Sequence, residues 1–243
     1  MDGVADQLEQ RLREDASPER AKHEKRYLKS DLEFLGATMG QIRAAVTAIA
    51  REHRGLAHDE MIELVEALWK APIHERRIAS VLLLGRFSRL LGVTDLPLLE
   101  LLVRESKTWA LVDALAGDVL GDLVGREPGD VSPVMDRWAT DDDFWVRRAS
   151  LLAELRPIRR GAPLDRFVHR AEPMLEEKEF FIRKAIGWVL REAGKRRSGE
   201  VAEWLAPRTH RASGVTMREA VRYLPTADGE RLMAAYRERR PVA

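Results

Sequence analysis

Residues 180–192 read FFIRKAIGWVLRE, and this stretch decides the fold of the 243-residue chain. Its apolar residues recur at intervals of three and four, which is the spacing of one buried face of a helix. Ala185 within it belongs to a series in which alanine returns every 35 or 36 residues. A fixed period of this length is typical of proteins built from stacked helical repeats. The members of this alanine series are Ala44, Ala79, Ala114, Ala149, Ala185 and Ala220.

The remainder of the chain shows the same helical periodicity. Residues 60–69 (EMIELVEALW) and 144–155 (FWVRRASLLAEL) each carry one apolar stripe at helical spacing. Ser17 before Pro18 predicts the start of a helix, and Thr38 with Gln41 predicts a capping box. Breaks rich in glycine and proline separate the segments, so each repeat has room for two helices.

The periodicity predicts an all-α protein. We expect a superhelical solenoid of about six helical hairpin repeats, with one or two capping helices in residues 1–30. No alternating run of apolar and polar residues indicates a strand. Because the repeat continues through the whole chain, residues 1–243 are predicted to form a single domain.

Composition narrows the class of protein. The net charge is +1, so a nucleic-acid-binding surface requires basic residues gathered on one face. The absence of cysteine excludes disulfides, thiol nucleophiles and cysteine-ligated zinc, and it fits a reducing compartment. The charged N-terminus lacks the apolar region of a signal peptide, and no apolar stretch is long enough to span a membrane. We therefore predict a cytoplasmic protein with no membrane partner.

Basic residues recur just before the alanines of the series. Equivalent positions of a solenoid line up on one surface, so these residues predict a basic groove. Ion pairs on an outer face are the alternative for the same residues. Asp113 interrupts the basic series, and Trp109 lies one helical turn before it. An acid in a basic, aromatic groove indicates chemistry on an anionic polymer. The predicted DNA-binding residues are Arg43, Arg147, Arg148, Arg183 and Lys184.

Several segments resemble the DNA alkylation repair family, the AlkD-type alkylpurine DNA glycosylases. The resemblance covers nearly the whole chain and is most specific in the segment at residues 179–192. It implies HEAT-like repeats and hydrolysis of the N-glycosidic bond of cationic alkylated purines, such as N3-methyladenine and N7-methylguanine. The segments are YLKSDLEFLG (27–36), SKTWALVD (106–113), DDDFWVRRAS (141–150), EFFIRKAIGWVLRE (179–192) and GVTMREAVRYL (214–224).

The resemblance also implies roles for individual residues. Asp113 matches the catalytic aspartate, and Trp109 and Trp188 match the tryptophans that flank the lesion nucleotide. Tyr27 matches a tyrosine that lines the same cleft, and Arg148 matches an arginine that contacts DNA. Ala110 stands where many relatives carry an aromatic or polar residue, which leaves more room beside Trp109 and leaves the size of the lesion open.

The chemistry explains why one carboxylate suffices. A cationic alkylpurine leaves without a general acid, and the carboxylate stabilises the oxocarbenium-like sugar and orients water. Tryptophan faces select the cationic base through cation–π attraction. The sequence predicts no metal and no cofactor, because His74-Glu75 lacks the remainder of a zinc motif. The resemblance implies that the enzyme binds the DNA backbone and does not flip the lesion nucleotide into a pocket.

The sequence thus predicts a monomeric, monofunctional glycosylase that acts on double-stranded DNA containing alkylated purines and leaves an abasic site. Three alternatives stay open: a self-resistance glycosylase for bulky adducts of a DNA-alkylating natural product, a non-catalytic relative that binds DNA structures, and a repeat scaffold for a protein partner. The other tryptophans are predicted to be structural: Trp69, Trp138, Trp145 and Trp204.

Overall fold

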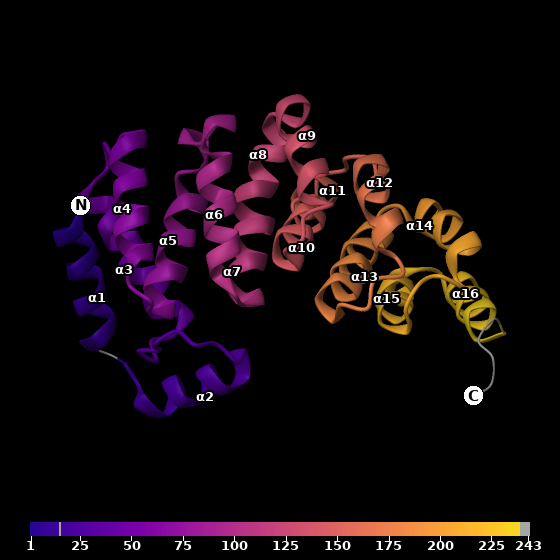
Figure 1. Ribbon diagram of the computed structural model, residues 1–243, viewed down its shortest axis with the longest axis horizontal. Coiled ribbons are helices and arrows are strands. Elements are labelled where there is room, and N and C mark those ends of the chain that lie inside the picture. Colours follow the sequence, from indigo (N-terminus) through magenta and orange to yellow (C-terminus); the bar gives the residue numbers. More distant parts are fainter. Residues whose placement is uncertain (15, 239–243) are drawn as a thin grey trace. The chain divides into compact units, whose positions relative to one another are not determined.

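The computed structural model describes residues 1–14 and 16–238, and the elements it forms there are helices (Figure 1). The one β-type contact in these ranges is an isolated bridge between Glu33 and Ile73. The predicted all-α fold is confirmed. The helices form two compact units, here called the N-terminal unit (Met1–Leu115) and the C-terminal unit (Ala116–Ala243).

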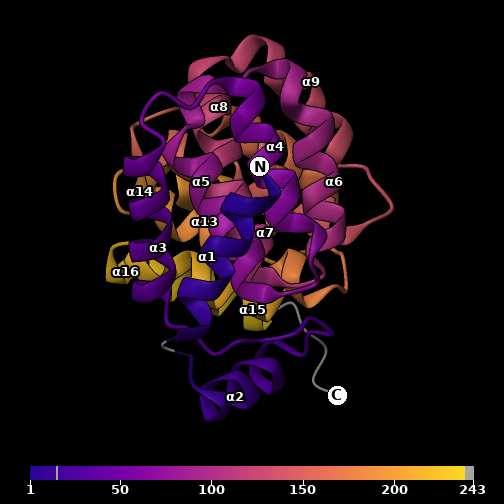
Figure 2. The same ribbon diagram turned by 90° about the vertical axis from the view of Figure 1, so that its left-hand side faces the viewer.

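The N-terminal unit is a stack of helices with apolar faces packed inward. α1 packs against α3 and α4, and α5 packs against α3, α4 and α7. α2 differs, because it contains no buried residue and lies apart from the stack (Figures 1 and 2). The helices are α1 (Asp2–Glu14), α2 (Pro18–Leu28), α3 (Met39–Glu52), α4 (His58–Lys70), α5 (His74–Arg86), α6 (Leu96–Ser106) and α7 (Trp109–Ala114), with 3-10 turns at Ser88–Leu90 and Val93–Asp95.

Both predicted helix starts are confirmed. The Ser17 hydroxyl accepts a hydrogen bond from the backbone N–H of Arg20 at the start of α2. At the start of α3, the Thr38 hydroxyl accepts from the Gln41 N–H, and the Gln41 side chain accepts from the Thr38 N–H. These side chains satisfy backbone donors that a helix leaves unpaired at its first turn.

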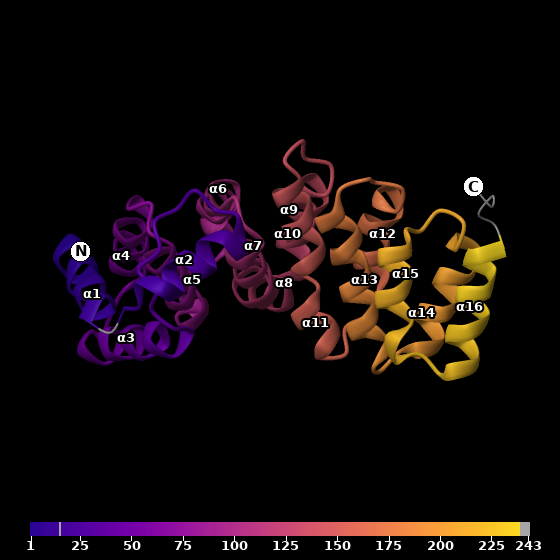
Figure 3. The same ribbon diagram turned by 90° about the horizontal axis from the view of Figure 1, so that it is seen from below.

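The C-terminal unit is built around α13, which packs against α10, α11, α14 and α15. Figure 3 shows α13 and α15 side by side. Gly187 permits this approach, since a Cβ atom there would lie 2.6 Å from the Cβ of Glu219. The elements are a π-helical turn (η3, Leu115–Leu120), α8 (Gly121–Arg126), α9 (Pro128–Trp138), α10 (Phe144–Leu152), α11 (Leu155–Arg159), α12 (Asp165–Met174), α13 (Phe180–Gly194), α14 (Ser198–Leu205), α15 (Gly214–Ala220) and α16 (Thr226–Glu238), with 3-10 turns at Ala206–Arg208 and Val221–Tyr223.

The alanine series lies mostly in the packed interior, as its period predicts. Four members are completely buried: Ala79, Ala149, Ala185 and Ala220. Ala114 is half-buried, whereas Ala44 is exposed and its neighbour Ala45 is buried instead. The first repeat is therefore shifted by one residue relative to the series, because α3 turns the following position toward the core.

Three of the four tryptophans predicted to be structural are buried: Trp69, Trp138 and Trp145. Trp204 is half-buried, and the guanidinium of Arg208 lies 4.8 Å above its ring. Among the described helices, none combines the length and the apolar character needed to cross a bilayer.

Candidate nucleic-acid interface

Three of the predicted site residues lie together in the N-terminal unit. Trp109 begins α7 and Asp113 follows one turn later, so the two side chains share a face of the helix. Tyr27, on α2, meets the Trp109 ring edge-on, with 5.9 Å between ring centroids and an angle of 87°. Trp109 and Asp113 are half-buried, and Tyr27 is 66% exposed. We call Tyr27 and Trp109 the aromatic patch; it is open to solvent, with a carboxylate one turn away.

Directly after Asp113, the helical backbone changes its pitch. The α-helical hydrogen-bond pattern ends at Ala114 and a π-helical turn follows over Leu115–Leu120. Such turns are rare and occur frequently at functional sites. The spacing of the apolar residues did not indicate this turn.

A segment between α2 and α3, residues 30–37, fixes the position of α2. We call it the strap. The carboxylate of Glu75, completely buried at the start of α5, accepts hydrogen bonds from the N–H groups of Leu35 (3.0 Å) and Gly36 (2.7 Å). The N–H of Glu33 donates to the carbonyl of Pro72, and its carbonyl accepts from the N–H of His74. His74-Glu75 is therefore an anchor for the strap.

Burial shifts the protonation of both anchoring residues. It lowers the pKa of His74 to about 4, so the imidazole is neutral at pH 7 and stacks on Phe34, with 4.6 Å between centroids. Burial raises the pKa of Glu75, and the two amide hydrogen bonds oppose this shift. Within residues 1–14 and 16–238, no group of three or more His, Asp or Glu side chains is arranged to hold a metal ion.

Gly36 joins the strap to the start of α2. Its φ is +91°, and a Cβ atom there would lie 2.0 Å from the carbonyl oxygen of Ser17. The N–H of Ser17 donates to the Gly36 carbonyl at 3.3 Å. Since α2 contributes nothing to the core, these contacts and the strap determine where Tyr27 stands against Trp109.

In the C-terminal unit, the predicted DNA-binding residues bond to protein groups. Arg147 forms two hydrogen bonds to the carboxylate of Glu177, at 3.0 and 2.9 Å, and donates to the carbonyls of Asp141 and Asp142. Lys184 forms an ion pair with Glu219. These contacts tie neighbouring helices together, so they correspond to the ion-pair interpretation of the same residues. The role of these residues in DNA binding stays a prediction.

Arg148 is only 3% exposed. Its guanidinium donates to the backbone carbonyl of Phe181 and lies 5.6 Å from the centroid of the Phe181 ring. It therefore joins α10 to the first turn of α13 and is turned into the protein. In this position it stabilises the unit, and its predicted contact with DNA stays a prediction.

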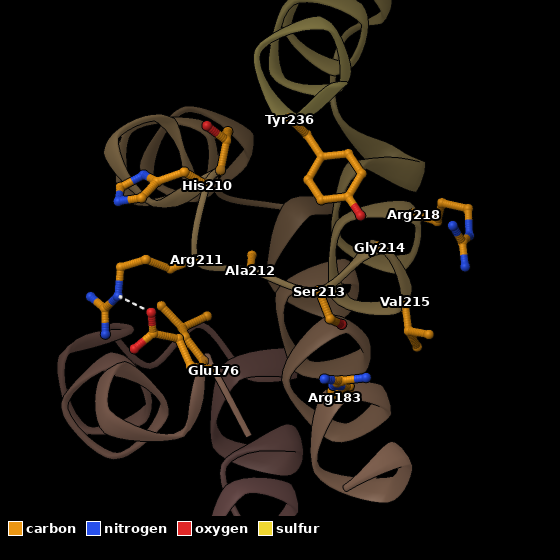
Figure 4. Close-up of a pocket in the computed structure, with 12 residues that line it drawn as sticks. Glu176, Arg183, His210, Arg211, Ala212, Ser213, Gly214, Val215, Arg218 and Tyr236 are labelled. Carbon is orange, nitrogen blue, oxygen red and sulfur yellow. Dashed lines mark ion pairs between the residues drawn. The ribbon is translucent and has the colours of Figure 1, made fainter. Parts of the chain in front are cut away.

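Arg183 lines a hollow of about 380 Å³ in the C-terminal unit (Figure 4). Its Nε donates to the carbonyl of Glu177, and Arg211, Arg218 and Tyr236 line the same hollow. Arg211 is drawn away from the centre, since it forms ion pairs with Glu172 and Glu176. Of the predicted basic residues in this unit, Arg183 alone lines this hollow, which has further arginines around it.

The two remaining predicted residues are Trp188 and Arg43. Trp188 lies in α13 of the C-terminal unit and is half-buried. Arg43 lies on α3 of the N-terminal unit and is exposed. Their predicted contacts with DNA stay predictions.

α2 carries a basic face that the repeat pattern of the sequence did not predict. Four side chains at helical spacing line an open hollow of about 570 Å³ together with Ser30: Lys22, Lys25, Arg26 and Lys29. All four are exposed, and each lacks an ion pair to any residue in the described ranges. Their spacing in the sequence was visible, but α2 falls outside the repeat period, so the alanine series did not point to it.

Comparison with known proteins identifies the family. The model of a family described as DNA alkylation repair enzyme matches residues 8–224. A predicted DNA alkylation repair enzyme from Enterococcus faecalis has a similar solved structure, with a TM-score of 0.78 and 22% sequence identity, over 87% of this chain and 97% of that chain. AlkD2 from Streptococcus mutans is similar with a TM-score of 0.61 and 16% identity, over 85% of this chain and 100% of that chain.

No curated protein matches the chain. At identities of 22% and 16%, the two solved structures show a shared fold. The family match is the stronger finding, because it extends over most of the sequence and includes Tyr27, Trp109 and Asp113. The chain belongs to the family of DNA alkylation repair enzymes.

Proposed function

We propose that this protein is a DNA glycosylase that hydrolyses the N-glycosidic bond of cationic N3- or N7-alkylated purines in duplex DNA and leaves an abasic site. One observation carries the proposal: Asp113 lies one helical turn from a tryptophan whose ring is met edge-on by Tyr27. This arrangement combines a carboxylate with aromatic faces on an open surface.

The reaction balances with water as its co-reactant. The bond between C1′ and the purine nitrogen breaks, and its electron pair neutralises the positive charge of the alkylated base. Positive charge develops on the sugar in the transition state, and a nearby carboxylate stabilises this state most strongly. The oxygen of water then bonds to C1′, and the carboxylate of Asp113 orients this water and accepts its proton.

The aromatic patch supports recognition of the cationic base. A cation placed over a tryptophan or tyrosine face gains about 0.5–2 kcal/mol, which distinguishes an alkylated purine from a neutral one. Because Tyr27 is 66% exposed, the patch is an open surface. An open surface supports our further proposal that the lesion is not flipped into a closed pocket and that bulky adducts are tolerated.

Base release from duplex DNA tests the proposal. We would compare wild type with Asp113→Asn on methylated duplex and on duplex carrying a bulky N3-adenine adduct, in single-turnover reactions with excess enzyme. We expect release of alkylpurines by the wild type and a loss of about 10²- to 10³-fold in the variant. Binding of undamaged duplex is measured in parallel and should persist.

The other outcomes separate the alternatives. Release of the bulky adduct alone would assign a self-resistance enzyme. Salt-dependent binding of duplex with no release of either base would assign a non-catalytic relative, and the absence of salt-dependent binding would favour a scaffold for a protein partner. We further propose a single-domain monomer, which sedimentation at several concentrations tests.

A further inference from the structure

Two lysines adopt a left-handed backbone conformation. They are Lys29, with φ of 49° after the end of α2, and Lys107, with φ of 47° after the end of α6. Among the described residues, they are the only ones other than glycine with a positive φ. Helix ends of this kind favour glycine or asparagine, and another residue costs about 1–2 kcal/mol. Lysine at both positions points to a use for the side chain that offsets the strain.

Both lysines lie beside the aromatic patch. Lys29 follows Tyr27 by two residues, and Lys107 precedes Trp109 by two residues. Two residues span at most about 7 Å of chain, and the two rings are in contact at 5.9 Å between centroids. Each lysine therefore lies close along the chain to one ring of the patch, Lys29 to Tyr27 and Lys107 to Trp109.

Neither lysine bonds to the rest of the protein in the described ranges. Both are exposed, and neither forms an ion pair or side-chain hydrogen bond with a described residue. A lysine carries a compact charge on a flexible four-carbon stem, which suits contact with a phosphate without selection of sequence. The two lysines are therefore unpaired cations at the edge of the candidate site.

α2 extends this charge away from the patch. The helix buries none of its residues, so packing of the core does not explain its presence. Lys22, Lys25 and Arg26 recur at helical spacing with Lys29 and line one hollow. A continuous row of unpaired cations on one helix fits a linear polyanion better than it fits a small anion.

We propose that Lys29 and Lys107 bind backbone phosphates next to the nucleotide held by the aromatic patch, and that the basic face of α2 continues this contact along the DNA backbone. This inference rests on the proposed function in taking duplex DNA as the substrate. It assigns phosphate binding to residues outside the basic series of the repeats.

The test replaces each lysine with glycine, the residue that its backbone conformation prefers. We would measure the dissociation constant of a short undamaged duplex by fluorescence anisotropy over a range of NaCl concentrations. For Lys29→Gly/Lys107→Gly, we expect the slope of log affinity against log salt to become shallower by about 2, and affinity at low salt to fall at least about tenfold. The thermal midpoint should stay unchanged or rise, because glycine relieves the strain.

Two controls make the result specific. Lys29→Arg/Lys107→Arg keeps both charges and should retain the wild-type slope. Arg51→Gln/Arg54→Gln removes two exposed charges, one in the last turn of α3 and one just after it, about 20 Å from the strap along the helix, and should change the slope by less than the glycine pair does.

Three outcomes would overturn the proposal. The first is an unchanged slope in the glycine variant. The second is a lowered thermal midpoint that accompanies the loss of binding, which would make the lysines structural. The third concerns polyglutamate, measured as a second polyanion. If the glycine variant lost binding to polyglutamate but kept binding to duplex DNA, the surface would be assigned to an acidic protein. Failure of the proposed function is distinct: the wild type would bind duplex with a salt slope reduced by the lysine changes, yet release no base.

Discussion

Two groups of basic residues, one in each unit, differ in how they are paired. In the C-terminal unit, Arg147, Arg148 and Lys184 donate to carboxylates or carbonyls of neighbouring helices or of the loop before α13. In the N-terminal unit, the basic face of α2 has no such partners among the described residues. The first group stabilises helix packing, whereas the second leaves its charge available to a ligand.

The difference shows that a basic pattern in a repeat protein has two origins. Within the repeat, a basic residue beside a buried alanine lies at a helix contact, where acceptors on the next helix are close. α2 lies outside the repeat and buries none of its residues, and the cations of its basic face form no ion pair with a described residue. A basic segment that interrupts the repeat period is therefore the better indicator of a ligand surface here.

Gly36→Ala should have the largest effect, because it breaks the feature that distinguishes the N-terminal unit. The added Cβ would meet the carbonyl of Ser17 at 2.0 Å, and the φ of +91° is strained for alanine. We expect a loss of about 3 kcal/mol in the stability of the strap and α2. Hydrogen exchange of residues 17–37 should speed up and base release should fall.

Gly85→Ala is the matched control for this change. Nothing lies within 4 Å of a Cβ at Gly85, which is inside α5, so alanine there should stabilise by about 0.5–1 kcal/mol. Unchanged exchange of residues 17–37 in Gly36→Ala would show that the strap does not hold α2.

Arg148→Ala tests the C-terminal side of the comparison. The change removes a buried guanidinium and leaves the carbonyl of Phe181 without this donor, so we expect a loss of about 2 kcal/mol in the free energy of unfolding. Chemical denaturation measures this loss, with the exposed Arg196→Ala as control. The salt slope of duplex binding should stay the same. A slope shallower by about 1 would instead show that Arg148 turns outward to a phosphate on DNA.

A dependence of stability on pH should distinguish the N-terminal unit through His74. Its pKa of about 4 in the folded protein lies below the ordinary 6.5 of the unfolded chain, so the unfolded state binds the extra proton. Stability is then lost as the pH falls from about 6.5 toward 4, by about 1 kcal/mol between pH 7 and pH 5.5. The raised pKa of Glu75 acts in the opposite direction. The difference between wild type and His74→Gln isolates the His74 contribution, and equal pH profiles for the two proteins would contradict it.

The smallest effect should come from Lys22→Gln/Lys25→Gln, which tests the part of the basic face of α2 that precedes Tyr27. Each change removes an exposed cation and leaves the core untouched. We expect duplex affinity to fall about threefold to tenfold, with a thermal midpoint within about 1 °C of wild type. An affinity equal to wild type at low salt would limit the phosphate contact to Lys29 and Lys107.

Much of this architecture follows from the sequence. The alanine period and the apolar stripes give helical repeats, since a helix with one apolar face must bury it against another. The capping residues Ser17 and Thr38 mark helix starts because their side chains bond backbone groups only a few residues away. The spacing of Trp109 and Asp113 places them on one helical face, which is a local property of a helix.

Contacts between residues far apart in the sequence did not follow from its pattern, and the tertiary structure alone decided them. Glu75 anchors the strap by bonding to Gly36 and Leu35, which precede it by 39 and 40 positions in the sequence. Tyr27 contacts Trp109, which follows it by 82 positions. The same holds for the partners of Arg147 and Arg148, since Glu177 lies in the loop before α13 and Phe181 lies in α13. The period of a sequence determines which face of a helix is apolar. Which charged side chain finds an acceptor, and which stays unpaired, depends on how the neighbouring helices pack around it.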